Sequence, residues 1–163
     1  MARSEATTRG RYETIYSTPS DRELVITRTF DAPRALVWKA FTDPKHVPNW
    51  HTGPEGTTMP VCEMDMRPGG AWHYVWRNAK GREFSASGSY REVDPPRRIV
   101  TVADLEGEEQ VTTLTFAEDS GRTTVTQSIR LAPSASVEQA LIYARMGTDS
   151  NYTRLDAYLA SLT

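Results

Sequence analysis

The feature that most constrains the fold of this chain is a run of segments in which apolar and polar residues alternate. Six such segments lie near 61–66, 71–77, 83–93, 99–105, 110–117 and 123–131. Stretches rich in Gly, Pro, Asn and Asp separate them, and such stretches are typical of turns. Because each connection is too short for a helical crossover, neighbouring strands are predicted to pair antiparallel.

The segments on either side of this run complete the order of elements. Residues 23–30 alternate in the same way, and apolar residues at helical spacing then predict one or two short helices. A long helix is predicted to end near Leu162. Either Ser134 or Ser136 could cap its start, and Ser136 with Gln139 fits a capping box. The order predicts an α+β fold in which helices pack on one face of an antiparallel sheet of about seven strands.

Length and charge narrow the class of protein. A chain of 163 residues with a net charge of −2 fits one domain, and it lacks the basic excess of a nucleic-acid-binding protein. The single cysteine, Cys62, excludes an internal disulfide. No apolar run reaches the roughly 18 residues of a membrane span, and residues 1–30 contain no apolar signal segment. We therefore expect a soluble, cytoplasmic protein without a membrane span.

The first residues differ in character from the rest of the chain. Residues 1–22 are polar and show no sustained period, so they are predicted to form a flexible N-terminal tail. The folded domain is predicted to span 23–163.

The long helix has small residues in the middle of the stripe that should face the sheet. Ala144, Gly147, Thr148 and Asn151 cluster there, and Gly147 alone costs the helix up to about 1 kcal/mol relative to alanine. Either the helix approaches the sheet closely at this point, or the space beneath it is a ligand cavity.

The predicted sheet is aromatic opposite this gap, both on the strand near 71–77 and on the next strand. Aromatic stripes are usual in cores, and a rigid aromatic wall also suits a flat or lipid-like ligand. Asn151 and Tyr152 would add polar groups that orient it. The candidate ligand-binding residues on both sides of the gap are Trp72, Tyr74, Trp76, Phe84, Tyr90, Ala144, Gly147, Thr148, Asn151 and Tyr152.

Three residues are candidates for proton transfer. His51 lies in a Gly/Pro-rich loop beside Trp50, where an ordinary surface histidine is also expected. Glu63 and Asp65 depend on the register of the first hairpin. A tight turn at 67–70 would put both carboxylates on the aromatic face with a raised pKa, whereas a bulge at the glycines would move them away.

Signatures of other chemistry are missing from the sequence. The three histidines lack the spacing of metal ligands, and the chain has neither a phosphate-binding loop nor a nucleophile elbow. No metal and no cofactor are therefore expected.

Several short motifs follow one another in a characteristic order. They are Phe30-Asp31-Ala32-Pro33, Val37-Trp38-Lys39-Ala40-Phe41-Thr42-Asp43-Pro44, Gly53-Pro54-Glu55-Gly56, Val61-Cys62-Glu63-Met64-Asp65-Met66-Arg67-Pro68-Gly69-Gly70 and Gly88-Ser89-Tyr90-Arg91-Glu92-Val93-Asp94-Pro95-Pro96. Over about residues 23–162 the chain resembles bacterial proteins named for similarity to the eukaryotic activator of a heat-shock chaperone ATPase. That family belongs to the START-like (SRPBCC, birch-pollen-allergen-like) superfamily.

The resemblance implies a helix-grip fold, in which a curved antiparallel sheet wraps the C-terminal helix and encloses a cavity. Superfamily members include lipid and hormone carriers, polyketide cyclases and co-chaperones, so the fold alone does not define the function. The first hypothesis is a non-enzymatic protein that binds a small apolar or aromatic molecule. The alternatives are a cyclase or hydrolase that uses the same cavity, and a protein that modulates a chaperone ATPase.

The chain departs from the pattern of this family at two places. Where relatives often have Trp-Trp-Gly-Pro, it has Trp50-His51-Thr52-Gly53-Pro54. Where their last helix often has Gly-Trp, it has Asn151-Tyr152. Both changes add polarity where the cavity or its entrance is expected.

Overall fold

The computed structural model describes residues 4–8 and 12–162, which form one sheet, two α-helices and a 3-10 turn. The helical elements are α1 (Arg34–Thr42), η1 (Val47–Asn49) and α2 (Val137–Ser161). The strands are β1 (Ser4–Thr8), β2 (Glu13–Ser20), β3 (Glu23–Phe30), β4 (Thr58–Met64), β5 (Ala71–Arg77), β6 (Glu83–Asp94), β7 (Arg98–Leu105), β8 (Glu108–Asp119) and β9 (Arg122–Arg130).

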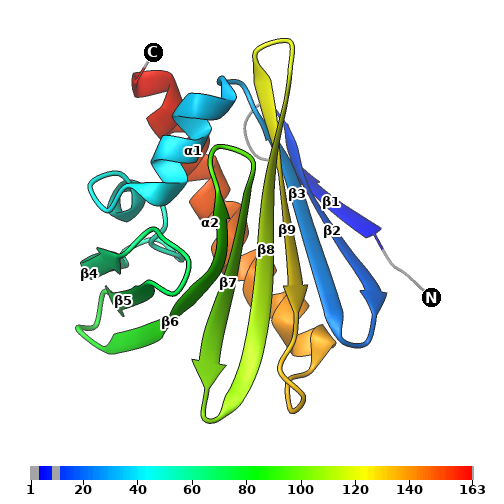
Figure 1. Ribbon diagram of the computed structural model, residues 1–163, viewed down its shortest axis with the longest axis vertical. Helices are drawn as coiled ribbons and strands as arrows, with labels where there is room; N and C mark the ends of the chain where they lie inside the picture. The colour runs from blue at the N-terminus through cyan, green and yellow to red at the C-terminus, as the bar shows by residue number, and fades with distance from the viewer. Residues whose placement is uncertain (1–3, 9–11, 163) are drawn as a thin grey trace.

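The sheet is antiparallel throughout the described residues, in the order β1-β2-β3-β9-β8-β7-β6-β5-β4. Its strands curve around α2, which runs behind them in Figure 1, and α1 packs near the C-terminal end of that helix. The predicted α+β helix-grip fold is therefore confirmed, with seven strands from β3 onward and two short helical segments after β3. The N-cap of α2 is Ser136, as predicted, and its hydroxyl accepts a hydrogen bond from the Gln139 N–H (3.3 Å).

The prediction of a tail over 1–22 is wrong for most of that segment. Ser4–Thr8 and Glu13–Ser20 form β1 and β2, and β2 pairs with β3 with Tyr16 opposite Ile26. Positions 1–3 and 9–11 of the predicted tail lie outside the described residues. The inward residues of β2 include Thr14 and Tyr16, so their burial is not visible as an apolar period.

Polar contacts fasten these first strands to α2. The Tyr16 hydroxyl donates a buried hydrogen bond to Asp149 Oδ1 (2.6 Å). Arg28 of β3 is almost fully buried, forms an ion pair with Asp156, and donates to Thr14 Oγ1 (2.7 Å). A buried arginine is tolerated when its charge is paired and its N–H groups are bonded in this way. The helix is therefore held against β2 and β3 by polar contacts as well as by apolar packing.

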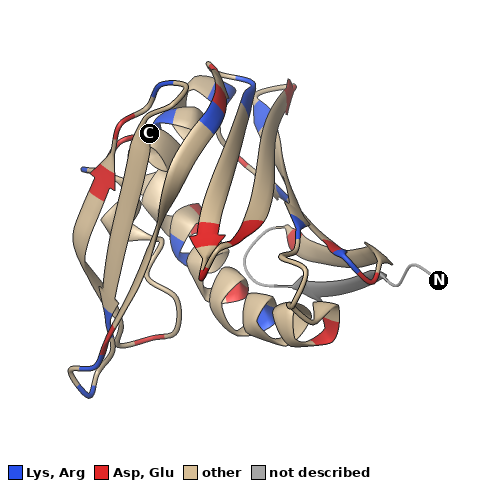
Figure 2. Ribbon diagram, turned by 60° about the horizontal axis from the view of Figure 1, so that its bottom comes forward, with Lys and Arg blue, Asp and Glu red and all other residues tan. Residues whose placement is uncertain are grey.

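Charged residues of both signs are distributed over the strands and helices, which agrees with the net charge of −2 (Figure 2). In the part of the chain that the structure describes, the helices are too short or too polar to cross a membrane.

Candidate ligand-binding site

The register of the first hairpin, formed by β4 and β5, determines where the two candidate carboxylates lie. Met64 pairs with Trp72, and Glu63 pairs with His73, which is the register shifted by one residue at the glycines. Gly70 lies directly against the backbone of Asp65, since a Cβ added to it would be 2.0 Å from the Asp65 carbonyl oxygen. The hairpin therefore turns the 63 and 65 side chains away from the aromatic face.

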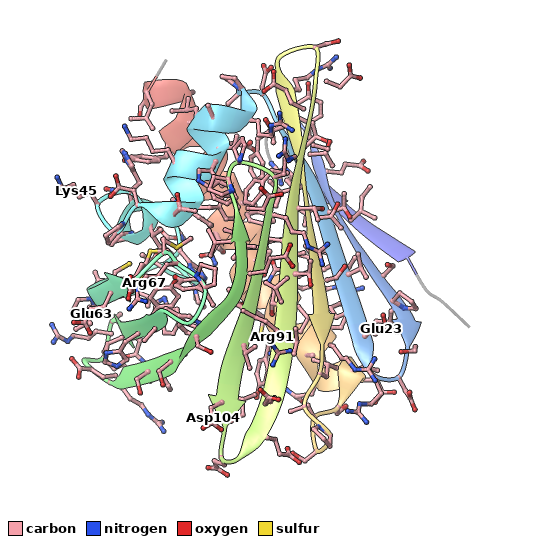
Figure 3. All side chains as sticks on the ribbon, viewed as in Figure 1. Glu23, Lys45, Glu63, Arg67, Arg91 and Asp104 are labelled. Atoms are coloured by element: carbon pink, nitrogen blue, oxygen red, sulfur yellow. The ribbon has the colours of Figure 1, made fainter. Side chains whose placement is uncertain are left out.

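Both carboxylates are exposed and already bonded to neighbours on the surface. Glu63 lies 3.1 Å from the ring of His73, and Arg67 donates to Asp65 (2.9 Å). Glu63 lies at the outer edge of the molecule, with Arg67 near it (Figure 3). Neither carboxylate is placed to act on a ligand held between the sheet and α2.

Two of the predicted aromatic wall residues belong to the core. Trp72 lies over Gly88 of the neighbouring strand, where an added Cβ would be 2.7 Å from the indole ring and 1.9 Å from the Val102 carbonyl oxygen. Tyr90 is buried in the same core cluster, and burial raises its pKa to about 12. Neither residue lines the three cavities described next.

Three cavities meet in the space between the sheet, α2 and the loop that follows η1. An outer cavity of about 620 Å³ lies between that loop and the ends of β5 and β6. A cavity of about 920 Å³ lies beneath the first half of α2, and we call it the helix cavity. An inner cavity of about 120 Å³ lies between them and the core. His51 lines all three, so each of them borders its side chain, and we call this place the junction.

His51 is surrounded by aromatic rings. Its imidazole stacks on Trp50 (centroid distance 5.3 Å) and meets Tyr74 and Trp76 edge to face (5.8 and 5.7 Å). Neither ring nitrogen is hydrogen-bonded to a residue that the structure describes. Burial, with a smaller contribution from the positive charge of Arg154, lowers the pKa of His51 from 6.5 to about 4. The side chain is therefore neutral at physiological pH and offers one donor and one acceptor.

The loop that carries His51 is held by two residues of α2. Arg154 donates to the carbonyl oxygens of Trp50 (2.9 Å) and Gly53 (2.7 Å) and to Thr52 Oγ1 (2.6 Å). Asn151 Oδ1 accepts from the Gly53 N–H (2.6 Å). On the other side, Trp76 Nε1 donates to the His51 carbonyl oxygen (2.9 Å). The position of the imidazole is thus determined by the helix and by β5 together.

The loop that carries His51 and the Asn151 position of α2 are in direct contact. The Gly53 N–H donates to Asn151 Oδ1 and joins them. The polar residues of the loop and the amide on α2 therefore form one structural feature.

The other predicted site residues divide among the cavities. Trp76 lines the outer and helix cavities, Ala144 lines the helix cavity, and Tyr74 and Tyr152 line the inner one. Thr148 lines the helix and inner cavities, and Asn151 the outer and inner ones. Phe84 is half exposed at the mouth of the outer cavity.

Gly147, the centre of the predicted gap, lines none of these three cavities. An added Cβ there would meet open space within 4 Å, so the glycine is not required by a close approach to the sheet.

Sequence reasoning missed Gln127 and Arg154. Gln127 lies on β9, lines the helix and inner cavities, and accepts a hydrogen bond from the Tyr152 hydroxyl (3.2 Å). Gln127 could have been found in the sequence as a polar residue at an inward position of a strand. The role of Arg154 could not, because it depends on contact with a loop that is distant in sequence. The described residues contain no cluster of three His, Cys, Asp or Glu side chains that could hold a metal ion.

Comparisons with known proteins show the same fold in other proteins. Among solved structures, the chain is similar to a protein from Rhodobacter sphaeroides (26% identity, TM-score 0.79, covering 94% of this chain and 100% of that one). It is also similar to a protein from Chromobacterium violaceum (27%, TM-score 0.72, covering 83% and 96%). An AHSA1-like protein from Aeromonas hydrophila shares the fold (21%, TM-score 0.71, covering 85% and 95%).

No curated protein matches the chain. A family model described as Activator of Hsp90 ATPase homolog 1-like protein matches residues 31–160, from the start of α1 to the last turn of α2. Because that match spans most of the sequence, the chain belongs to the family of Activator of Hsp90 ATPase homolog 1-like proteins.

Proposed function

We propose that the protein binds a small apolar or aromatic molecule in the connected cavities around His51. The observation that carries this proposal is the meeting of three cavities at one neutral imidazole that no described residue bonds. Ligand sites in proteins are mostly apolar spaces of about 300–1,000 Å³ with a few polar groups that set orientation. The helix cavity and the outer cavity both have volumes in that range.

The aromatic residues around the junction suit such a ligand. Trp50, Tyr74 and Trp76 present ring surfaces at angles to one another, so a flat molecule can stack on one ring and meet the edge of another. The two candidate carboxylates, Glu63 and Asp65, lie on the far side of the first hairpin, and Glu55 is accompanied by Lys80 where it lines the outer cavity.

The alternative of a cyclase or hydrolase has less support from the same residues. General acid–base catalysis is most efficient when the pKa lies near the working pH. The lowered pKa of His51, about 4, makes its imidazole a weak base. The cavity therefore favours a carrier over an enzyme that moves protons. Modulation of a chaperone ATPase is suggested by the family description alone.

Native mass spectrometry of the protein as purified tests the proposal. A mass excess that disappears on denaturation is expected, and its size identifies the bound molecule. A matched pair of variants locates it: Ala144→Phe fills part of the helix cavity and should reduce the bound fraction, whereas Ile142→Phe, on the exposed side of the same helix, should not. Equal occupancy in both variants would place the ligand elsewhere and contradict the proposal.

A further inference from the structure

The inner cavity differs from the other two in the kind of polar group that it presents. Four aromatic side chains line it, together with Val47 and Leu114. Its polar members are His51, Gln127, Thr148 and Asn151, and its described lining includes no Lys, Arg, Asp or Glu. A ligand group that enters it therefore meets neutral hydrogen-bonding partners in an otherwise apolar chamber.

Each of the two amides accepts a hydrogen bond at its side-chain oxygen. The Gly53 N–H and Arg154 both point at the side-chain oxygen of Asn151 (2.6 and 3.4 Å). The Tyr152 hydroxyl donates to the side-chain oxygen of Gln127 (3.2 Å). Since both oxygens are occupied, each amide offers its NH₂ group, and neither nitrogen is hydrogen-bonded to a described residue. The amides that line the chamber therefore present donors.

The arginines near the inner cavity are already paired, so an ionised ligand group would find no free counter-ion there among the described residues. The guanidinium of Arg154 is committed to the loop, where it donates to the carbonyl oxygens of Trp50 and Gly53. Arg28 is committed to Asp156 and Thr14 on the other side of the helix. A carboxylate moved from water into a chamber without its own cation loses hydration that neutral donors do not replace. A neutral oxygen acceptor loses far less.

We infer that the inner cavity is a subsite for a neutral oxygen acceptor, the carbonyl of an aromatic ketone or a related compound. The apolar arms on either side of that carbonyl would extend into the outer cavity and the helix cavity, both of which also border His51. The inference rests on the proposed function, because it names the ligand class of the same site. The amides of Gln127 and Asn151 donate to the carbonyl oxygen, and the surrounding rings pack on the arms.

Four probes that carry two phenyl rings on one central carbon test this inference by titration calorimetry on the full chain. Benzophenone has a central carbonyl, diphenylmethane has none, diphenylacetate carries a carboxylate and benzhydrylamine a cationic amine. Benzophenone should bind about tenfold more tightly than diphenylmethane, the effect of one net hydrogen bond. Both ionised probes should bind more weakly than the hydrocarbon.

Two isosteric variants identify the donors. Asn151→Asp and Gln127→Glu keep an oxygen where Gly53 and Tyr152 donate, but each replaces the free NH₂ by an acceptor. Each should lower benzophenone affinity about tenfold and leave diphenylmethane affinity unchanged. The matched control is Asn49→Asp in η1, which adds the same charge at an exposed residue that lines none of the three cavities and should change neither affinity. Unchanged hydrocarbon binding also shows that each variant is folded.

The outcomes distinguish a failure of the acceptor subsite from a failure of the ligand-binding function. If diphenylmethane binds as tightly as benzophenone, or if diphenylacetate binds most tightly, the acceptor subsite is overturned while the ligand-binding function stands. If the variants weaken both neutral probes equally, the amides support the structure rather than the ligand, and the subsite is again overturned. If no probe binds and the purified protein carries no mass excess, the proposed function itself fails.

Discussion

The two halves of α2 have different surroundings although they form one continuous helix. Residues 137–146 cover the helix cavity and expose their outer side, where Ile142 is 50% and Met146 59% accessible. Residues 149–159 pack into the core, where Leu155 is 0% and Leu159 3% accessible. The second half also forms the polar contacts to β2, to β3 and to the His51 loop. The second half of α2, residues 149–159, therefore holds the helix on the sheet, and we call it the anchored half. The first half, residues 137–146, covers the helix cavity, and we call it the roof half.

The difference between the halves shows that residues of the anchored half determine the geometry of the site, including residues that do not line a cavity themselves. Asn151 and Arg154 position the loop, and the loop positions His51. The first half, in contrast, contributes cavity lining and few contacts to the fold. Substitutions in the first half should therefore act mainly on ligand uptake, whereas those in the second half should act on stability and, at Asn151, on ligand uptake as well.

The largest effect is expected from removing a buried side chain of the anchored half. Leu155→Ala should lower the free energy of unfolding by about 2–5 kcal/mol, because a fully buried leucine leaves a cavity behind. Ile142→Ala in the roof half should change it by less than about 0.5 kcal/mol, because that side chain is half exposed. Urea denaturation of both variants measures the contrast, and equal losses would contradict it.

Acid should lower the free energy of unfolding through the protonation of His51. Its pKa is about 4 in the folded state against 6.5 normally, so the unfolded chain binds the proton first as the pH falls. This contribution to stability is complete above pH 6.5 and is lost between pH 6.5 and about 4, by up to about 3 kcal/mol.

His51→Gln isolates this contribution. In urea denaturation at several pH values, the variant should lose less stability than the parent chain across that window. His73→Gln is the control, because His73 is partly exposed on the outer side of the first hairpin. Parallel curves for the parent chain and His51→Gln would show that the imidazole is not held neutral.

The smallest effect is expected at the boundary of the two halves. Gly147→Ala should raise the free energy of unfolding by about 0.5–1 kcal/mol, because alanine favours the helix and its Cβ meets open space. Ligand occupancy in the native mass spectrum should not change, since Gly147 lines none of the three cavities. A loss of occupancy would assign the glycine to the site.

The order of elements could be predicted because its signals are local. Alternation, turn residues and the Ser136 cap each depend on neighbours in sequence, and the structure has them where expected. The strand β2 could not be predicted in this way. Its inward residues Thr14 and Tyr16 are polar, and their burial is stabilised by Arg28 and by Asp149 of a distant helix.

The candidate site was predicted in part for the same reason. The position of the cavity could be inferred from small residues on α2 facing an aromatic strand, and Trp76, Thr148 and Asn151 do line it. The hairpin register could not, because two glycines permit either alignment of Glu63 and Asp65. Whether an aromatic residue lines a cavity or fills the core depends on what lies beneath it, as Trp72 over Gly88 illustrates.

The bond between Tyr16 and Asp149 has a consequence for how the chain is made. The two residues are 133 positions apart, and β3 pairs with β9, which is also synthesised late. During synthesis the N-terminal strands emerge first, without the helix that satisfies their polar groups. The edge of β3 and the guanidinium of Arg28 therefore stay uncovered until nearly the whole chain has left the ribosome. Folding of this protein is expected to be completed when α2 packs on the sheet and covers the cavity.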